Sequence, residues 1–537
     1  MRTAAAALIS MVALAGTGLP AFSQTIQTPA EQSGYTRYTQ YQDIAPFLDQ
    51  VAKASKQAKV LVAGKTGEVK DFAPADIYLV VLTAEGIATP QALNRKKPTI
   101  LVLGAQHGNE QSGKEAALTL IRDLAVGDLK PLLGQVNVLV MPQTNPYGNF
   151  VNRRTNEQDL DLNRDHVKLE TPETRAIHAV FRAWMPEASI DVHEQGDNYY
   201  RVNSGRVTNA NIAPAIRAFA RDTIYKETEA LVTAGGYTWH EYLVTEAMGS
   251  QGAAGAAEPT GANLEELTRP STVDLNDGRN SLGIYETISF IQESASRHDI
   301  PTLKDRTTYQ YLGIKGLVQS VARHAEEVRT LVASSRAALL KKASAPAPGD
   351  LVHLRMVHAR DPKDPQITIQ HFQTVPGADA ATASPMKVVT EVVRNWFPNV
   401  EPTISVPRAF GYIVPAANKD VVKTMIAHGI AVQVFTADTE VEVERYLVDD
   451  ITPSTEDYVA PDKIAVTKQA VKVTARKGDY YVNGAQPAAN LIPNLLEPQA
   501  EFGFIRYRMF NLVPDKGATF PFLRVVKRQT LPLETIK

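Results

Sequence analysis

Short apolar, β-branched runs alternate with longer amphipathic segments along the first part of the chain. Short apolar runs bounded by turn residues are typical of buried strands, and apolar positions at steps of three and four are typical of helices. On this basis we predict strands at residues 77–82, 99–103, 136–141 and 189–192 and helices at residues 111–124 and 171–184. Because the two kinds of element alternate, we expect an α/β fold with helices on both faces of a sheet.

A long helical pattern and a linker divide the chain. Residues 317–342 keep their apolar positions on one stripe, and residues 343–349 are rich in Ala, Ser and Pro, as linkers are. Beyond the linker we predict one βαβ-like unit at residues 411–435 and short strands at residues 367–372, 471–475, 480–482 and 504–507. We therefore expect a β-rich α/β accessory domain at residues 350–537.

The first residues resemble an export signal. Arg2 gives a positive start, residues 3–19 are apolar and Ala-rich, and small residues precede Gln24. We predict a signal peptide at residues 1–23 and a periplasmic or secreted protein. A membrane anchor is the alternative, but the apolar run is short for a span and polar residues follow at once. Because no later run is long and apolar enough, we expect no membrane contact after cleavage.

The composition of the chain excludes several classes of function. The 56 Lys and Arg balance 58 Asp and Glu, so no basic surface for nucleic acid is indicated. The chain has no cysteine, which excludes disulfides, thiolate metal sites and a cysteine nucleophile. A bound metal ion must therefore be held by histidine and carboxylate.

One loop carries a candidate metal-binding pair. The apolar run 100–104 leads into a loop with His107 and Glu110, and a predicted helix follows. In an open α/β sheet such a strand end is where ligands bind, and an imidazole and a carboxylate three residues apart suit one Zn²⁺. The same spacing recurs at His324 and Glu327, but that copy lies inside a helical pattern, where such pairs usually face solvent.

A third candidate ligand ends another strand. His193 closes the apolar run 188–192. Two histidines and one carboxylate leave a fourth position open for water, which is typical of catalytic rather than structural zinc. Between the ligands, residues 145–165 hold arginines and amides that suit binding of a carboxylate and polarisation of a carbonyl oxygen, although a solvated surface loop has the same composition.

The order of these motifs resembles the zinc carboxypeptidases of the carboxypeptidase A type (peptidase family M14), from about residue 35 to residue 296. The resemblance implies a catalytic domain at residues 35–342 with a mixed, mainly parallel sheet flanked by helices. It also implies one zinc ion per chain and a peptide substrate that loses C-terminal residues. Neither the oligomeric state nor the substrate side chain is indicated.

The resemblance assigns roles residue by residue. The positions that match the zinc ligands are His107, Glu110 and His193. Asp161 matches the carboxylate that orients the first histidine, because a metal-bound imidazole needs its other N–H held. Arg154 matches the arginine that stabilises the oxyanion, with Arg153 as its competitor. Asn163 and Arg164 match the pair that binds the terminal carboxylate of the substrate.

The general base is expected on a late strand. Glu293 matches it, and Glu286 is the alternative; because an odd number of residues separates the two, a regular strand places them on opposite faces. Such a glutamate would take a proton from the attacking water and pass it to the leaving amine. For a mobile tyrosine of this family, Tyr237, Tyr242 and Tyr285 all remain open.

Two further segments have two interpretations each. Residues 249–270 form either a lid or a solvated loop, and Tyr199, Tyr200 and Arg201 either line a substrate groove or pack at its rim. The function also has alternatives to a carboxypeptidase. The chain could be a zinc amidase or deacylase acting on another carboxylate-bearing substrate, or a non-catalytic binding protein with a vestigial site.

Overall fold

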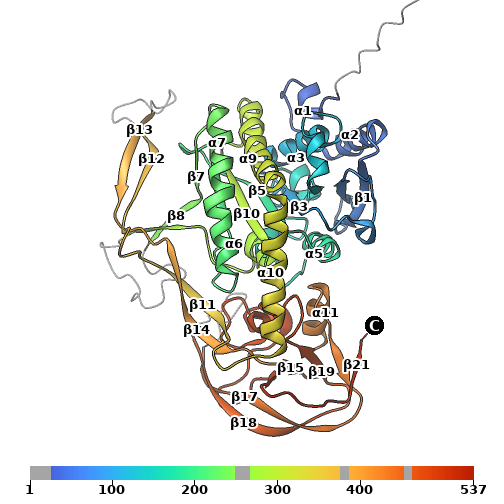
Figure 1. The fold of residues 1–537 in the computed structure, drawn as a ribbon, viewed down its shortest axis with the longest axis vertical. Helices are drawn as coiled ribbons and strands as arrows, with labels where there is room; N and C mark the ends of the chain where they lie inside the picture. Colours follow the sequence, from blue (N-terminus) through green and yellow to red (C-terminus); the bar gives the residue numbers. More distant parts are fainter. Residues whose placement is uncertain (1–25, 248–265, 375–385, 453–462, 537) are drawn as a thin grey trace, which may run out of the picture.

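A computed structural model describes residues 26–247, 266–374, 386–452 and 463–536 (Figure 1). The predicted signal peptide, residues 1–23, lies outside this part of the chain. Within it, none of the helices combines the length and the apolar character needed to cross a bilayer.

The central element is an eight-stranded sheet with the strand order β1-β2-β4-β3-β5-β10-β6-β7. Its strands are β1 (Ala58–Lys65), β2 (Asp76–Leu82), β3 (Thr99–Gly104), β4 (Asn137–Met141), β5 (Ala188–Gly196), β6 (Val202–Arg206), β7 (Trp239–Glu241) and β10 (Ile288–Ser296). The inner pairs β4-β3, β3-β5 and β5-β10 are parallel, as is β6-β7, and the other three pairs are antiparallel. The expected mixed, mainly parallel sheet is confirmed.

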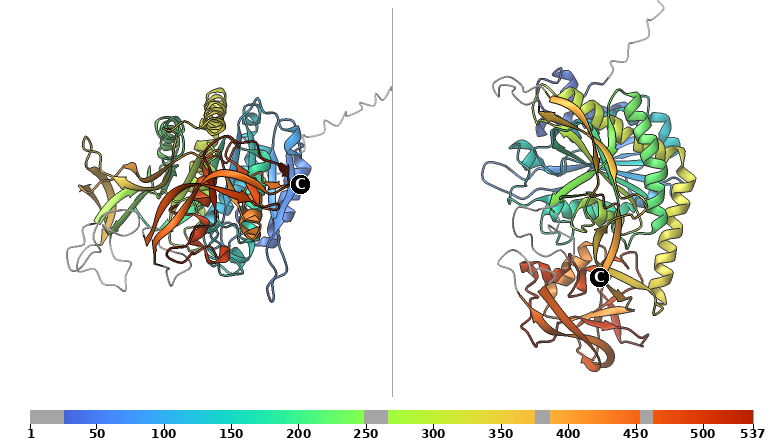
Figure 2. Two further views of the ribbon diagram at one scale, coloured as in Figure 1. Left: turned by 90° about the horizontal axis from the view of Figure 1, so that it is seen from below. Right: turned by 90° about the vertical axis from the view of Figure 1, so that its left-hand side faces the viewer.

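Helices lie on both faces of this sheet (Figure 2). A Cβ added at Gly113 of α3 (Gln111–Ala125) would meet Val192 of β5, whereas one added at Gly278 of α8 (Gly278–Gly283) would meet Asp191. Adjacent strand residues point to opposite faces, so α3 and α8 cover opposite faces. The remaining helices of this part are α1 (Pro29–Gln32), α2 (Tyr41–Ala54), α4 (Pro146–Phe150), α5 (Pro172–Trp184), α6 (Pro214–Phe219), α7 (Lys226–Ala234), α9 (Leu303–Arg323) and α10 (Ala325–Ser344).

The predicted long helix at residues 317–342 is wrong in one respect. The structure breaks it at His324 (φ −105°, ψ 28°), between α9 and α10. The Nε2 of His324 lies 2.9 Å from Glu227 of α7, so this residue is tied to a neighbouring helix. The apolar stripe itself is buried as expected, at Leu317, Val321, Val328, Val332 and Leu339.

The C-terminal region is rich in strands, as expected. Its largest sheet has the order β18-β17-β20-β15-β19-β16-β21, and the pairs β11-β14 and β12-β13 form two-stranded arms, as does β8-β9 of the preceding region. The strands are β8 (Leu243–Ala247), β9 (Glu266–Pro270), β11 (Leu351–Ala359), β12 (Ile367–Thr374), β13 (Met386–Val393), β14 (Asn399–Pro407), β15 (Gly411–Val414), β16 (Gln433–Phe435), β17 (Thr439–Ile451), β18 (Ile464–Ala475), β19 (Tyr480–Asn483), β20 (Leu523–Val525) and β21 (Leu533–Thr535). The helices are α11 (Lys419–Ala427) and α12 (Leu491–Leu496).

Two predictions for this region need correction. The strand predicted at residues 504–507 is a 3-10 turn, Phe504–Arg506, because the ring of Phe504 packs on Phe510 inside the core. The βαβ-like unit has its two strands and helix, but β19 lies between β15 and β16 and pairs antiparallel with both. The unit is therefore a split crossover.

The C-terminal region packs directly on the sheet-bearing region. One apolar cluster is continuous from Ile100 and Phe181 to Tyr412 and Phe520. Polar contacts join the same surfaces: Arg182 of α5 donates to the carbonyl of Ile426 at 2.8 Å. The two regions therefore bury a common core.

Candidate active site

The loop after β3 is shaped by close backbone contacts. Ala105 adopts a positive φ of 54°, which turns the chain sharply at the strand end. A Cβ at Gly108 would lie 2.0 Å from the backbone carbon of Gly148 in α4, so only glycine fits there. This packing fixes the turn in which the N–H of Glu110 donates to the carbonyl of His107.

Three predicted ligands meet at this turn. The Nδ1 atoms of His107 and His193 lie 3.0 Å apart. The two oxygens of Glu110 lie 2.7 Å from the Nδ1 of His107 and 2.9 Å from the Nδ1 of His193. One atom of each side chain lies within 4.8 Å of the other two, and all three side chains are buried.

A carboxylate holds the outer nitrogen of each imidazole. The Nε2 of His107 lies 3.0 Å from Asp161, and the Nε2 of His193 lies 2.7 Å from Asp191. An imidazole that donates its Nε2 proton outward offers a lone pair at Nδ1, the form that binds metal. Tetrahedral zinc separates its ligand atoms by about 3.3 Å. The donor set therefore fits a zinc ion.

The carboxylates also dominate the charge of the cluster. Burial raises the pKa of Glu110, but the attraction of His107 and His193 lowers this pKa by more than burial raises it. The carboxylate is therefore held ionised. Burial lowers the pKa of His193, but Asp191 and Glu110 raise it well above the ordinary value. A negative ligand and two outer carboxylates create a strong local preference for positive charge.

Asp191 is a partner that sequence reasoning missed. It lies two residues before His193 on β5, so both side chains face the same side of the sheet, and this spacing was the available signal. Its Oδ2 also accepts a 2.6 Å hydrogen bond from Gln106. The Oε1 of Gln106 lies 2.9 Å from the Nε2 of His166, so a buried polar chain extends from the ligand into the core.

Glu293 lies beside the three candidate ligands. On β10 it is in register with His193 of the parallel neighbour β5. Burial raises the pKa of Glu293 to about 7, with opposing effects from the nearby His193 and Glu110. A carboxylate of this kind exchanges a proton readily near neutral pH.

Glu286 lies elsewhere. It precedes β10 in a turn with φ 59°, so the argument from alternating strand faces does not apply to it. Its Oε2 accepts a hydrogen bond of 2.9 Å from the N–H of Ala213, and its Oε1 lies 3.4 Å from Asn490 of the C-terminal region. Glu286 therefore holds neighbouring segments together.

The two candidate arginines, Arg153 and Arg154, make different contacts. Arg154 pairs with Asp161 at 2.9 Å and lies 3.6 Å from Glu110, with nearly half of its side chain exposed toward solvent. Arg153 stacks on the ring of Tyr147 and donates to the carbonyl of Asn156. Only Arg154 is at the edge of the candidate metal site.

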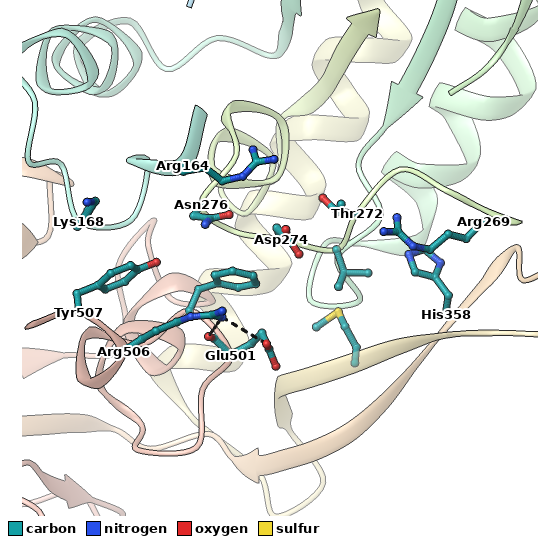
Figure 3. A pocket seen from close by; sticks show the side chains of 13 residues that line it. Arg164, Lys168, Arg269, Thr272, Asp274, Asn276, His358, Glu501, Arg506 and Tyr507 are labelled. Carbon is teal, nitrogen blue, oxygen red and sulfur yellow. Dashed lines mark hydrogen bonds and ion pairs between the residues drawn. The ribbon is translucent and has the colours of Figure 1, made fainter. Parts of the chain in front are cut away.

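Asn163 and Arg164 differ in accessibility. Asn163 is buried: its Oδ1 accepts from the N–H of Gly278 at 2.7 Å, and its Nδ2 lies 3.4 Å from the Nε2 of His193. Arg164 is exposed and lines a cavity beside the site (Figure 3). The arginine is thus available to an incoming carboxylate, whereas the amide is already engaged.

The three open tyrosines now have distinct environments. Burial raises the pKa of Tyr242, and the next largest cause is the charge of Glu293, so this phenol lies near the candidate base. Tyr237 packs on Tyr309, and Tyr285 donates to the carbonyl of His428. Of these three tyrosines, Tyr242 is therefore the one that lies near the site.

The two ambiguous segments are partly resolved. The backbone N–H of Gln370 in β12 donates to the hydroxyl of Tyr200, and the ring of Phe372 packs on Tyr199, which favours packing between segments. Most of the predicted lid or loop, residues 248–265, lies outside the described residues. The second His-x-x-Glu pair forms surface contacts: the Nδ1 of His324 lies 3.4 Å from Glu327.

Comparison with known proteins finds similarity to zinc carboxypeptidases. Residues 44–219 match the zinc carboxypeptidase family (Peptidase_M14). Carboxypeptidase 2 of Trichophyton tonsurans is 25% identical over 465 residues, covering 80% of this chain and 77% of that protein. Carboxypeptidase SOL1 of Arabidopsis thaliana is 31% identical over 112 residues, covering 18% and 23%. A metallo-carboxypeptidase structure from Pseudomonas aeruginosa is 17% identical, with a TM-score of 0.39 over 55% of this chain and 71% of that one.

Proposed function

We propose that this chain is a zinc-dependent carboxypeptidase, a peptide hydrolase that removes single amino acids from the C-termini of peptides. The observation that carries this proposal is the convergence of His107, Glu110 and His193 with outer carboxylates on both imidazoles. These three side chains would hold one zinc ion per chain. When bound, that ion would lower the pKa of a water molecule and polarise the scissile carbonyl.

Glu293 is proposed as the general base. It is buried beside His193, and burial holds its pKa near 7, so it can accept a proton from the attacking water and release it to the leaving amine. Tyr242 lies near this carboxylate and is a candidate donor to the same region. The contacts of Glu286 with Ala213 and Asn490 support the choice of Glu293 over Glu286 for this role.

Two arginines are proposed to handle the charges of the substrate. Arg154, at the exposed edge of the site, would donate hydrogen bonds to the oxygen that becomes negative during attack. Arg164 would bind the terminal carboxylate by forked hydrogen bonds. Because Asn163 is buried against His193 and Gly278, we assign it to positioning Arg164 and His193.

The proposal also covers the domain boundaries and the cellular location of the protein. We assign residues 35–342 to catalysis and residues 350–537 to an accessory domain that shares a core with it. Residues 1–23 would direct export to the periplasm or the exterior and be removed there.

The proposal is tested with pairs of peptides that differ only in a free or an amidated C-terminus. The purified protein should release the last residue from the free form alone, as detected by mass spectrometry. Cleavage of amidated or N-acylated substrates at equal rates would favour an amidase or deacylase. An inactive protein that binds the free peptides would be a binding protein with a vestigial site.

A further inference from the structure

A chain of buried hydrogen bonds leads away from the candidate metal site, starting at Asp191, the outer partner of His193. Asp191 accepts from the Nε2 of Gln106 at 2.6 Å, and the Oε1 of Gln106 lies 2.9 Å from the Nε2 of His166. The Nδ1 of His166 in turn lies 3.0 Å from the Nε2 of His178 in α5. All of these side chains are buried. The chain therefore joins a candidate metal ligand to two histidines that have no part in the proposed function.

The hydrogen bonds of this chain all run in one direction. A carboxylate accepts hydrogen bonds, so Gln106 turns its NH₂ group to Asp191 and its oxygen to His166. The Nε2 of His166 must then carry the proton that it donates to that oxygen. Burial lowers the pKa of His166 to about 4, so the ring is neutral and its Nδ1 accepts from the Nε2 of His178. Each link therefore fixes the donor and the acceptor of the next.

The middle of the chain is closely packed against α8. A Cβ added at Gly278 would lie 2.7 Å from the Oδ2 of Asp191 and 2.9 Å from the Nε2 of Gln106. The same Cβ would lie 3.3 Å from the Nε2 of His166. Because not even a methyl group fits on this side, no water molecule can replace a lost link there. Within the described residues the Oδ1 of Asp191 has no hydrogen-bond partner, so this carboxylate depends on Gln106 and His193 for its donors.

A residue of the C-terminal region holds the far end of the chain. The ring of His428, which follows α11, packs edge-on against the ring of His178, with the ring centroids 5.1 Å apart. The Nε2 of His428 donates to the carbonyl of Val167, the residue next to His166, at 2.8 Å. The hydroxyl of Tyr285 donates to the carbonyl of His428 at 3.0 Å. One side chain of the C-terminal region therefore contacts the ring of one histidine and the backbone beside the other.

We propose that this hydrogen-bonded chain positions His193 to bind zinc and that, through His428, the C-terminal region takes a direct part in building the metal site. The inference rests on the zinc site of the proposed function. Donation from Gln106 orients Asp191, whose carboxylate holds the Nε2 proton of His193 and so leaves the Nδ1 lone pair for the metal. The links beyond Asp191 are positioning residues, because they act through this carboxylate and not through contact with the metal or the substrate.

The test measures the dissociation constant of zinc by competition with a chromophoric chelator. His166→Leu removes the donor to Gln106 and should weaken zinc binding about 3- to 10-fold, which is less than the effect of losing a direct partner of a ligand. His166→Gln keeps an N–H for Gln106 and should bind zinc nearly as tightly as wild type. The matched control is His324→Leu, which removes a histidine that contacts Glu227 outside the chain and should leave the affinity unchanged.

A double variant tests the part of the C-terminal region. His428→Ala alone should weaken zinc binding, because both ends of the pair His166 and His178 lose a contact. In a protein that also carries His166→Leu, the same substitution should have no further effect, because the chain is then broken already. Additive losses would mean that the two residues act independently, and they would overturn the role assigned to His428.

A second readout needs no bound zinc. Burial lowers the pKa values of His166 and His178, so at pH 7 both should be neutral, with the proton on Nε2. Nitrogen NMR spectra of isotope-labelled histidine measure this, and the leucine variants assign the signals. A proton on Nδ1 of either ring, or unchanged zinc affinity in folded His166→Leu, would overturn the inference.

Failure of the proposed function is recognised separately. A protein that binds zinc but releases no C-terminal residue is not a carboxypeptidase, and the measured affinities still decide the inference. A wild-type protein that binds no zinc overturns both.

Discussion

The Nδ1 atoms of His107 and His193 face each other at 3.0 Å, although both residues are buried. Each imidazole has its Nε2 against a carboxylate, Asp161 or Asp191. Both inward nitrogens also contact the carboxylate of Glu110, so a proton or a metal ion at this point is stabilised by the surrounding carboxylates. The arrangement is therefore built around a positive charge.

The first prediction concerns this charge. The purified protein should contain about one zinc per chain by elemental analysis. Removal by a chelator should lower the midpoint of thermal unfolding, because ligand binding at a thousand times the dissociation constant stabilises a protein by about 4 kcal/mol. Zinc-free protein with the same midpoint in chelator would contradict the assignment.

Asp191 should be required for tight metal binding. Asp191→Ala frees the Nε2 of His193 and should weaken zinc binding about 10- to 100-fold, measured by competition with a chromophoric chelator. Gln106→Ala, which removes a hydrogen bond to Asp191, should have a smaller effect in the same direction. Asp159→Ala, on an exposed loop, is the control and should bind zinc as tightly as wild type does.

The two adjacent arginines should differ sharply. Arg154→Ala removes the cation next to Glu110 and should lower kcat on the order of 100- to 1,000-fold. Arg153→Ala removes a stacking contact with Tyr147 and should change kcat little. Steady-state kinetics on one peptide compare the two variants, and a larger loss in Arg153→Ala would reverse their assignment.

Asp274 should destabilise the folded protein at alkaline pH. Its pKa rises from 3.8 to about 6 on folding, so the folded state holds a proton that the unfolded chain has lost. The stability contributed by that proton is present below pH 4 and disappears as the pH rises through 6.

Asp274→Asn should therefore be more stable than wild type at pH 8, on the order of 1 to 3 kcal/mol from the size of this shift. The difference should vanish near pH 4. Urea unfolding at the two pH values measures it. Equal stabilities at pH 8 would mean that the carboxylate is compensated in solution.

The sequence predicted residues that the structure brings together at the candidate site, but fewer of the contacts around them. The central strands and α3 follow from apolar runs and periodicity, and the order of the motifs pointed to Asp161, which lies at the Nε2 of His107. Asp191 was not predicted from the sequence, because its role depends on where β5 places the ring of His193. The burial of Asn163 likewise follows from the approach of Gly278, which is distant in the sequence.

Long-range contacts also explain the misplaced elements. His324 breaks a continuous helical pattern because Glu227 of another helix lies beside it. Phe504 belongs to a turn because Phe510 packs on it. The cavity next to Arg164 combines segments from two regions of the chain, so no local pattern indicated it.

The most direct test of the central claim is Glu293→Gln, with zinc content and release of the C-terminal residue measured on the same sample. Glutamine keeps the shape of the side chain but cannot accept the proton, so we predict unchanged zinc and a kcat lowered about 100- to 10,000-fold. Glu286→Gln, which keeps an oxygen for the N–H of Ala213, should stay active. Full activity of Glu293→Gln, or loss of its zinc, would contradict the account.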